Sequence, residues 1–153
     1  MKRQVLTLDE ELVEEAKAVS DFLAFYSGDK DLSRIIYVDW TARDVLSHVA
    51  SWHMSFARNL IDAVNNIKPS PFRGSLTEVN EREVKYLSQF SVAELIQKIK
   101  LAQEQIEQNI RHQGIIGIAY KKGSRDYSPI EHLEIVRRHI KAHLADVEEK
   151  YRG

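Results

Sequence analysis

The sequence predicts an all-α protein, a four-helix bundle with one extra short helix in the connection between the second and third long helices. Three observations predict this fold class. Four long segments repeat their apolar residues at the spacing of one helix face. Each of these segments follows a serine or threonine that can cap a helix. No repeat or low-complexity tract interrupts them. Such helices pack most simply around one core, so we expect residues 1–153 to form a single domain.

The first helix is expected over residues 8–26. Thr7 precedes it as the cap, and Glu10, three residues later, completes a capping box. Gly28 ends the apolar repeat, and the polar residues 29–33 that follow are typical of a loop.

The second long helix is expected over residues 42–66, after the cap Thr41 and with Asp44 close to the capping-box position. Residues 35–40, Ile-Ile-Tyr-Val-Asp-Trp, come just before it and have the composition of a short strand. No partner strand is evident elsewhere in the sequence. We therefore expect an extended connection at residues 35–40.

A loop with two prolines and a glycine, residues 67–75, separates this helix from the short one, which is expected over residues 76–87. Ser91 then caps the third long helix, expected over residues 92–112. Residues 114–127 hold two internal glycines and a basic turn, which indicate an irregular and partly extended loop.

The last helical stretch, residues 128–151, has the strongest start signal. Ser128 is the cap, Pro129 stands at the first helical position, where its missing N–H costs nothing, and Glu131 completes a capping box. Its apolar stripe comprises Leu133, Val136, Ile140, Leu144 and Val147.

Three histidines are the candidate metal ligands. His139 and His143 are four residues apart, so on a helix both imidazoles lie on one face, at the edge of the apolar stripe. His48 lies at the edge of the stripe of the second long helix. If these two helices are neighbours, the three rings can converge on one transition metal and leave a coordination position open for a metal-bound water. Histidine pairs at this spacing also occur on solvated helix faces, and that reading stays open.

Two segments resemble a known family. Trp40-Thr-Ala-Arg-Asp-Val-Leu-Ser-His48-Val-Ala-Ser-Trp52 resembles the second-helix signature of the DinB-like, YfiT-related superfamily, and His139-Ile-Lys-Ala-His143 resembles its closing His-x-x-x-His. The segment Leu76-Thr-Glu-Val-Asn80 is similar to the branch that contains ClbS and DfsB.

The resemblance implies a four-helix bundle with a divalent metal ion, most often nickel or zinc, held by three histidines. Carried over by position, these ligands are His48, His139 and His143. The wider family includes thiol transfer, isomerisation and hydrolysis, so the resemblance does not fix a reaction. We expect a metal-dependent enzyme acting on a small molecule, either a hydrolase or a thiol S-transferase. The alternative is a non-catalytic bundle that binds or sequesters a metal or small ligand.

Other polar and aromatic residues are candidates for the surroundings of the metal. His53, His132 and Trp52 are the candidate pocket residues, with His132 two helical turns before His139. Asp44 and Asp146 are close enough in sequence to the histidines to orient an imidazole, although each also fits a solvated helix charge. The sequence identifies no general base.

Composition bounds the partners. The chain has 22 basic and 23 acidic residues and no cysteine. The balance gives no reason to expect nucleic acid or an acidic membrane as partner, and the missing cysteine removes disulfides and thiolate nucleophiles. The first residues do not form a signal peptide, and we expect a cytoplasmic protein. A homodimer paired through an apolar helix face is a further expectation. A third alternative for the function is a structural bundle that self-associates, in which the histidines are incidental.

Overall fold

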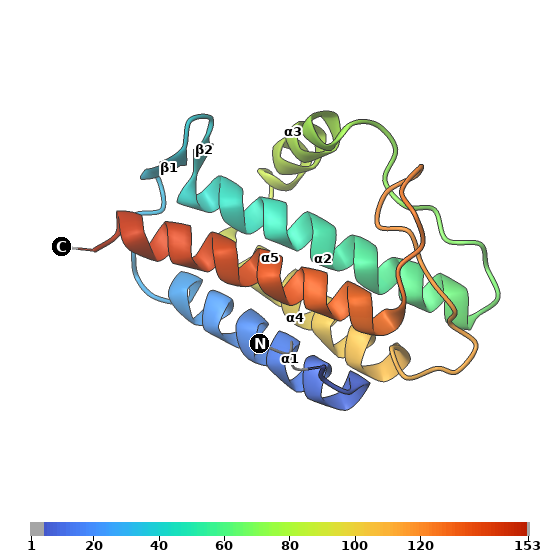
Figure 1. Cartoon of the computed structure of the whole chain (residues 1–153). Helices are drawn as coiled ribbons and strands as arrows, with labels where there is room; N and C mark the ends of the chain where they lie inside the picture. The colour runs from blue at the N-terminus through green and yellow to red at the C-terminus, as the bar shows by residue number, and fades with distance from the viewer. Residues whose placement is uncertain (1–4, 153) are drawn as a thin grey trace.

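The computed structural model describes residues 5–152 and confirms the predicted helical bundle. Four long helices lie side by side, and a short helix crosses beyond one edge of the bundle (Figure 1). The helices are α1 (Leu8–Tyr26), α2 (Ala42–Val64), α3 (Leu76–Leu87), α4 (Val92–Asn109) and α5 (Pro129–Lys150).

Capping fixes where the long helices begin. A full capping box forms at the start of α1, α2, α4 and α5, with the cap hydroxyl accepting from the third helical N–H and the acidic side chain accepting in return. The short helix α3 is capped by Ser75. All five predicted starts are therefore confirmed.

Two expectations about local structure are wrong. The helices α2 and α4 end at Val64 and Asn109, earlier than the predicted ends at positions 66 and 112. The segment 35–40 is not a simple extended connection, because strand β1 (Ile35–Tyr37) pairs antiparallel with β2 (Trp40–Thr41). The partner strand, β2, begins only three residues after β1 ends, and its two residues are too few to give a recognisable strand pattern in the sequence.

The helices pack in two close pairs. α5 lies most extensively against α1, and α2 against α4, while α2 and α5 meet over a smaller area. One apolar cluster includes Phe22, Leu46 and Ile99, and the other includes Leu60 and Ile106. The limited packing between α2 and α5 leaves space between these two helices, and the candidate site lies there.

Two loops close one side of that space. The backbone N–H of Lys122 donates to the carbonyl of Phe72, and Ile118 and Tyr127 exchange backbone hydrogen bonds. These bonds hold Tyr120 beside Trp52 of α2, with 5.9 Å between the ring centres. The expectation of a partly extended loop at residues 114–127 is confirmed. Within residues 5–152, none of the helices combines the length and apolar character needed to cross a membrane.

Candidate metal centre

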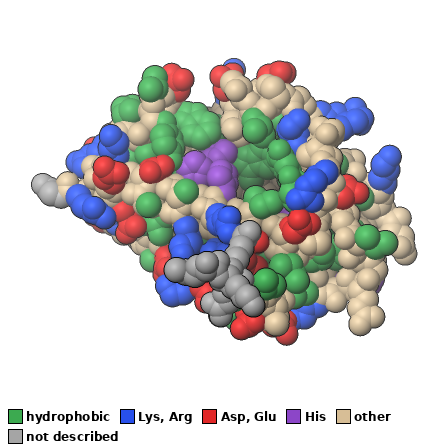
Figure 2. All heavy atoms as spheres, in the orientation of Figure 1, with side chains coloured by type: hydrophobic (Ala, Val, Ile, Leu, Met, Phe, Trp, Pro, Cys, Tyr) green, Lys and Arg blue, Asp and Glu red, His purple; other side chains and the backbone are tan. Residues whose placement is uncertain are grey.

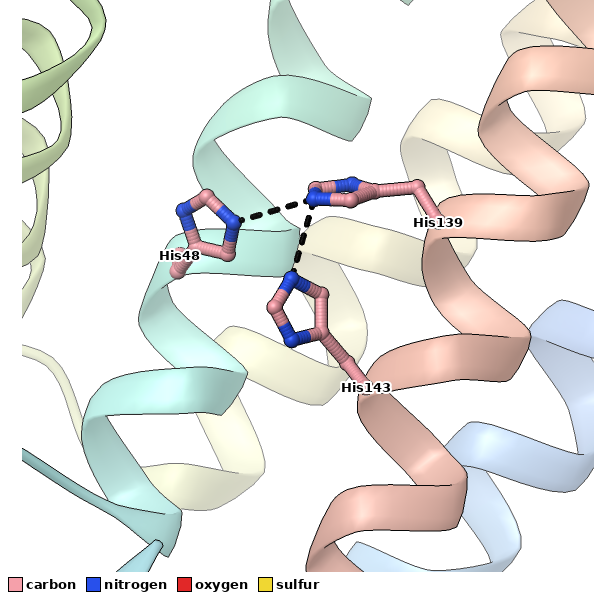
Figure 3. A group of neighbouring side chains, drawn as sticks. All are labelled: His48, His139 and His143. Carbon is pink, nitrogen blue, oxygen red and sulfur yellow. Dashed lines mark hydrogen bonds between the residues drawn. The ribbon is translucent and has the colours of Figure 1, made fainter. Parts of the chain in front are cut away.

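Three imidazoles from two helices converge at the space between α2 and α5. His48 projects from α2, and His139 and His143 project from successive turns of α5 (Figure 3). The Nε2 atom of His139 lies 3.3 Å from Nε2 of His48 and 2.9 Å from Nε2 of His143. One nitrogen from each ring lies within 4.8 Å of the other two. The structure thus brings together the three histidines that the sequence singled out.

Hydrogen bonds among the rings do not account for this arrangement. A neutral imidazole has one N–H and one lone pair, and here the same atom, Nε2, faces inward from all three rings. If Nε2 of His139 carries the hydrogen, it can be directed at only one of its two neighbours. A single cation accepts lone pairs from all three nitrogens at once.

The distances between the nitrogens fit a transition metal. Two imidazole nitrogens that each lie about 2.0–2.1 Å from one ion are about 2.9 Å apart at a right angle and about 3.3 Å apart at the tetrahedral angle. The two observed separations, 2.9 Å and 3.3 Å, match these values. The donor set of three imidazoles suits zinc and nickel.

The environment keeps the rings in the form that binds metals. Burial, together with the neighbouring imidazoles His143 and His139, lowers the pKa of His48 to about 3, and Asn80 partly opposes this shift. Burial and His139 lower the pKa of His143 to about 4, with Asp146 acting in the opposite direction. Both rings are therefore neutral at neutral pH, with a lone pair available.

Tyr37 connects His143 to Asp146, a role that the sequence did not suggest. The Tyr37 hydroxyl donates to Oδ2 of Asp146 at 2.5 Å and lies 2.9 Å from Nδ1 of His143. Since its hydrogen is used by the carboxylate, the hydroxyl oxygen accepts from Nδ1–H of His143. That fixes the tautomer in which Nε2 holds the lone pair and faces the other rings.

The two aspartates considered from the sequence have different positions. Asp146 acts on His143 through the Tyr37 hydroxyl. The sequence suggested that Asp146 orients the imidazole, and the structure places one hydroxyl group between the two side chains. Asp44 is occupied in the capping box of α2, where its carboxylate accepts from the Thr41 N–H at 3.0 Å. No motif marks Tyr37, which reaches the site only because the β1–β2 hairpin folds against α5.

The histidines lie at one end of an aromatic cavity of about 800 Å³. Figure 2 shows a patch of histidine atoms in a hollow of this face, with hydrophobic side chains beside it. Trp40 and Trp52, which are the two tryptophans of the chain, both line the cavity, together with Phe56 and Tyr120. This size is ordinary for a small-molecule site.

The candidate pocket residues fall into two groups. Trp52 lines the cavity, and its indole N–H donates to Oδ1 of Asn80 at 2.8 Å. His132 also lines the cavity and stacks on Phe56 with 4.5 Å between ring centres. His53, in contrast, is not among the lining residues, because it faces the interior between α2 and α4.

His53 belongs to a separate buried polar cluster. Its Nε2 lies 2.8 Å from Oε1 of Gln103, and the Gln103 amide donates to Oε1 of Glu15 at 2.7 Å. Burial lowers the pKa of His53 to about 4, so the ring is neutral. His53 follows His48 by five residues on α2, a rotation of about 140° around the helix. Its side chain therefore faces the core, whereas His48 faces the cavity.

Comparison with solved structures supports the assignment of the fold. A crystal structure of the mycothiol-dependent maleylpyruvate isomerase superposes on 93% of this chain with a TM-score of 0.76 and 16% sequence identity. A histidine-to-alanine variant of that isomerase superposes with a TM-score of 0.74 and 17% identity. This chain spans 61% of the length of either isomerase chain. No protein-family model and no curated protein matches the chain.

At these identities the likeness shows the fold alone, a helical bundle that this chain shares with the isomerase. The placement in the DinB-like superfamily, and within it in the branch of ClbS and DfsB, stays a prediction. Within that fold, this protein carries a group of three histidines that can hold a metal ion beside a cavity for a small molecule.

Proposed function

We propose that this protein is a divalent-metal-dependent enzyme that acts on a small molecule. One observation carries the proposal: three imidazole Nε2 atoms converge at the end of a cavity of ligand size. His48, His139 and His143 would hold the ion, with zinc or nickel as the expected metal. Such an ion supplies Lewis acidity, polarising a substrate oxygen or stabilising a thiolate.

The residues around the histidines have separable roles. Tyr37 holds the His143 ring in the metal-binding tautomer through its bond to Nδ1. Trp40 and Trp52 form apolar walls that exclude water from the reacting centre. His132 supplies a proton acceptor further along the cavity.

The tautomer of His132 follows from its partner. Its Nε2 lies 2.8 Å from the carbonyl oxygen of Ile118, which can only accept, so Nε2 carries the hydrogen. The lone pair is then on Nδ1. Burial lowers the pKa of His132, which keeps the ring neutral, with the Nδ1 lone pair available to a bound substrate.

Two reaction types fit these parts, hydrolysis and transfer of a low-molecular-weight thiol. The neighbours in the comparison are described as mycothiol-dependent, which supports the thiol reading for this chain. The chain has no cysteine, so any sulfur nucleophile would have to come from a second small molecule.

Elemental analysis tests the proposal. Protein refolded with zinc or nickel and then desalted is expected to hold about one equivalent of metal. The variant His48→Ala is expected to lose it, whereas His112→Ala, which removes an exposed histidine outside the cluster, is expected to retain it. A wild type that holds no metal, or an unchanged metal content in His48→Ala, overturns the proposal.

A second candidate is a bundle that binds metal or a small ligand without turnover. It is favoured by the surroundings of the three rings. Within the described residues, Asp146 is the carboxylate that hydrogen bonds connect to the three rings, and it already accepts from the Tyr37 hydroxyl. It is therefore not free to act as a general base on a substrate. Tight binding of metal and ligand, combined with absent turnover across ester, amide, epoxide and thiol-transfer substrates, would favour this candidate.

A further inference from the structure

We propose that Ser55 and Asn59 form a second polar subsite in the cavity. This subsite binds an uncharged hydrogen-bonding group at one end of the ligand, while the other end of the ligand reaches the three histidines. The inference deepens the proposed function and rests on it for the position of the reacting end. It assigns the substrate class: an elongated, largely apolar and uncharged molecule with a hydroxyl or amide group remote from the reacting atoms.

The first argument is the state of Asn59. This side chain is only 1 % exposed, and its Oδ1 atom has no hydrogen-bond partner within residues 5–152. Ser55, one turn earlier on α2, is 2 % exposed, and its Oγ also has no partner there. Leaving such groups unpaired costs about 1–3 kcal/mol each, so a folded protein normally supplies a partner. Both residues border the cavity, and their two oxygens are covered in this structure. A small rotation of either side chain would bring its oxygen to the cavity wall, where a ligand can supply the partner.

The second argument is the alignment of α2. His48, Trp52, Ser55 and Asn59 follow one another at steps of four, three and four residues, which keeps them on one face of the helix. All four line the same cavity. The metal end, the aromatic wall and the polar subsite are therefore arranged along a single rigid element.

This alignment sets the length of the ligand. From His48 to Asn59 the helix rises about 16 Å. A metal–sulfur bond takes up about 2.3 Å and a hydrogen bond about 2.9 Å of that distance. About 11 Å remains for the molecule itself, enough for an extended chain of roughly eight carbons or an equivalent ring system.

The third argument is the charge of the walls. Among the described residues that line the cavity there is no lysine or arginine, and the charged side chains are Asp39 and Glu81. Of the basic residues of the neighbouring loop, Arg125 is engaged elsewhere, since it pairs with Glu131 at 2.9 Å. Away from the three histidines, a carboxylate or phosphate in this cavity would lose its hydration without a cationic partner. The Ser55–Asn59 end of the cavity therefore selects against anionic groups.

The acceptors in the cavity define the preferred group. Oδ1 of Asn59 and Nδ1 of His132 can both accept a hydrogen bond, and the Ser55 hydroxyl can accept or donate. A hydroxyl or primary amide offers the matching N–H or O–H at no cost in charge. An ordered water at the same place is the competing explanation, and the experiment separates the two.

Four thiols with the same eight-carbon chain serve as probes: mercapto-octanol, mercapto-octanamide, octanethiol and mercapto-octanoate. Binding to zinc-loaded protein is measured by calorimetry and by fluorescence, because both tryptophans of the chain line the cavity. The alcohol and the amide are expected to bind about three- to tenfold more tightly than octanethiol, and the carboxylate more weakly than all three.

Matched variants locate the effect. Asn59→Leu and Ser55→Ala are expected to reduce or remove the preference for the alcohol and amide over octanethiol. Ser47→Ala is the control, since Ser47 is another buried serine of α2 without a hydrogen-bond partner in the described chain, but it does not line the cavity. It is expected to keep the full preference.

The outcomes separate this inference from the proposed function. Cobalt-substituted protein reports metal uptake and thiol ligation through its visible absorption. Protein that takes up no cobalt overturns the proposed function, whereas bound cobalt with a spectrum that thiols leave unchanged removes only its thiol-transfer form. The fluorescence comparison is then repeated on metal-free protein with the same four probes. Equal binding of alcohol and octanethiol, or a preference that Asn59→Leu leaves intact, overturns the inference and indicates a water site only.

Discussion

Replacing Glu15 by glutamine is expected to remove a pH-dependent loss of stability. Glu15 is completely buried and accepts one hydrogen bond from Gln103. Its Oε2 has no hydrogen-bond partner within the described residues and lies 3.8 Å from Nε2 of His53. Burial raises the pKa of Glu15 to about 7, with a further contribution from the acidic groups of Glu107 and Glu11 and an opposing one from Gln103. Glutamine keeps the shape and the accepting oxygen but cannot ionise.

The sign follows from the two pKa values of the carboxyl group. In the unfolded chain it titrates near 4.5, and in the folded protein near 7. The folded state therefore holds the proton more tightly. The contribution of this proton to the free energy of unfolding is lost as the pH rises from about 4.5 to about 7. A shift of this size corresponds to about 3 kcal/mol, of which about 2 kcal/mol falls between about pH 5.5 and about pH 8.5.

The buried histidines act in the opposite direction and cancel in the comparison. Burial lowers the pKa of His53 to about 4, so its contribution to stability is lost as the pH falls below the unfolded value of 6.5. Both proteins retain His53, which lies 3.8 Å from Oε2 of Glu15. The difference between wild type and Glu15→Gln at each pH therefore reports the Glu15 carboxyl group together with its interaction with His53.

The assay is urea unfolding across this pH range, followed by far-ultraviolet circular dichroism with a chelator present, so that metal binding does not contribute. Relative to Glu15→Gln, the wild type is expected to lose about 2 kcal/mol of unfolding free energy between about pH 5.5 and about pH 8.5. Glu14→Gln, an exposed change on the same helix, is the control and should follow the wild type. Parallel curves for wild type and Glu15→Gln would refute the reasoning.

Two further predictions concern the site and the core. Tyr37→Phe removes the hydroxyl that accepts from His143 and is expected to weaken metal binding about 10- to 100-fold, measured by competition with a chromogenic chelator; Tyr86→Phe, at an exposed tyrosine of α3, should bind as wild type does. An unchanged affinity in Tyr37→Phe would contradict the assigned hydrogen bond. Phe22→Ala empties a fully buried position of the core and is expected to cost about 3–5 kcal/mol of unfolding free energy in urea titrations, whereas Phe22→Leu should cost clearly less; equal costs would argue against tight packing there.

The starts of the helices were predictable because their signals are local. A serine or threonine cap and an acidic residue three positions later act within one turn, so Thr7, Thr41, Ser91 and Ser128 could be read directly. The ends were harder to place. No glycine or proline stands at the last turn of α2 or α4, so the apolar repeat extended both predictions beyond the observed ends.

The β1–β2 hairpin was missed for a related reason. Its turn, Val38-Asp39, lacks the glycine or asparagine that usually marks a two-residue hairpin loop. Its second strand, Trp40–Thr41, is only two residues long and runs directly into the cap of α2. Such a short pairing leaves no periodic pattern to detect.

The histidines of the candidate centre were predictable from spacing and family resemblance, but their supporting groups were not. Tyr37 reaches His143 across 106 positions of sequence, and no pattern along the chain links the two. Ser55 and Asn59 resemble ordinary polar residues of a helix, and their burial is a consequence of how α2, α5 and the loops assemble. Tertiary contacts of this kind are set by packing rather than by periodicity.

The separation of the histidines along the chain also bears on how the protein matures. His48 stands on α2 and its two companions on α5, with 91 positions between His48 and His139. A chain emerging from the ribosome therefore cannot bring the three nitrogens together until α5 has been synthesised and has docked. Uptake of the ion would then follow the docking of α5, and the bound ion would oppose the separation of α5 from α2.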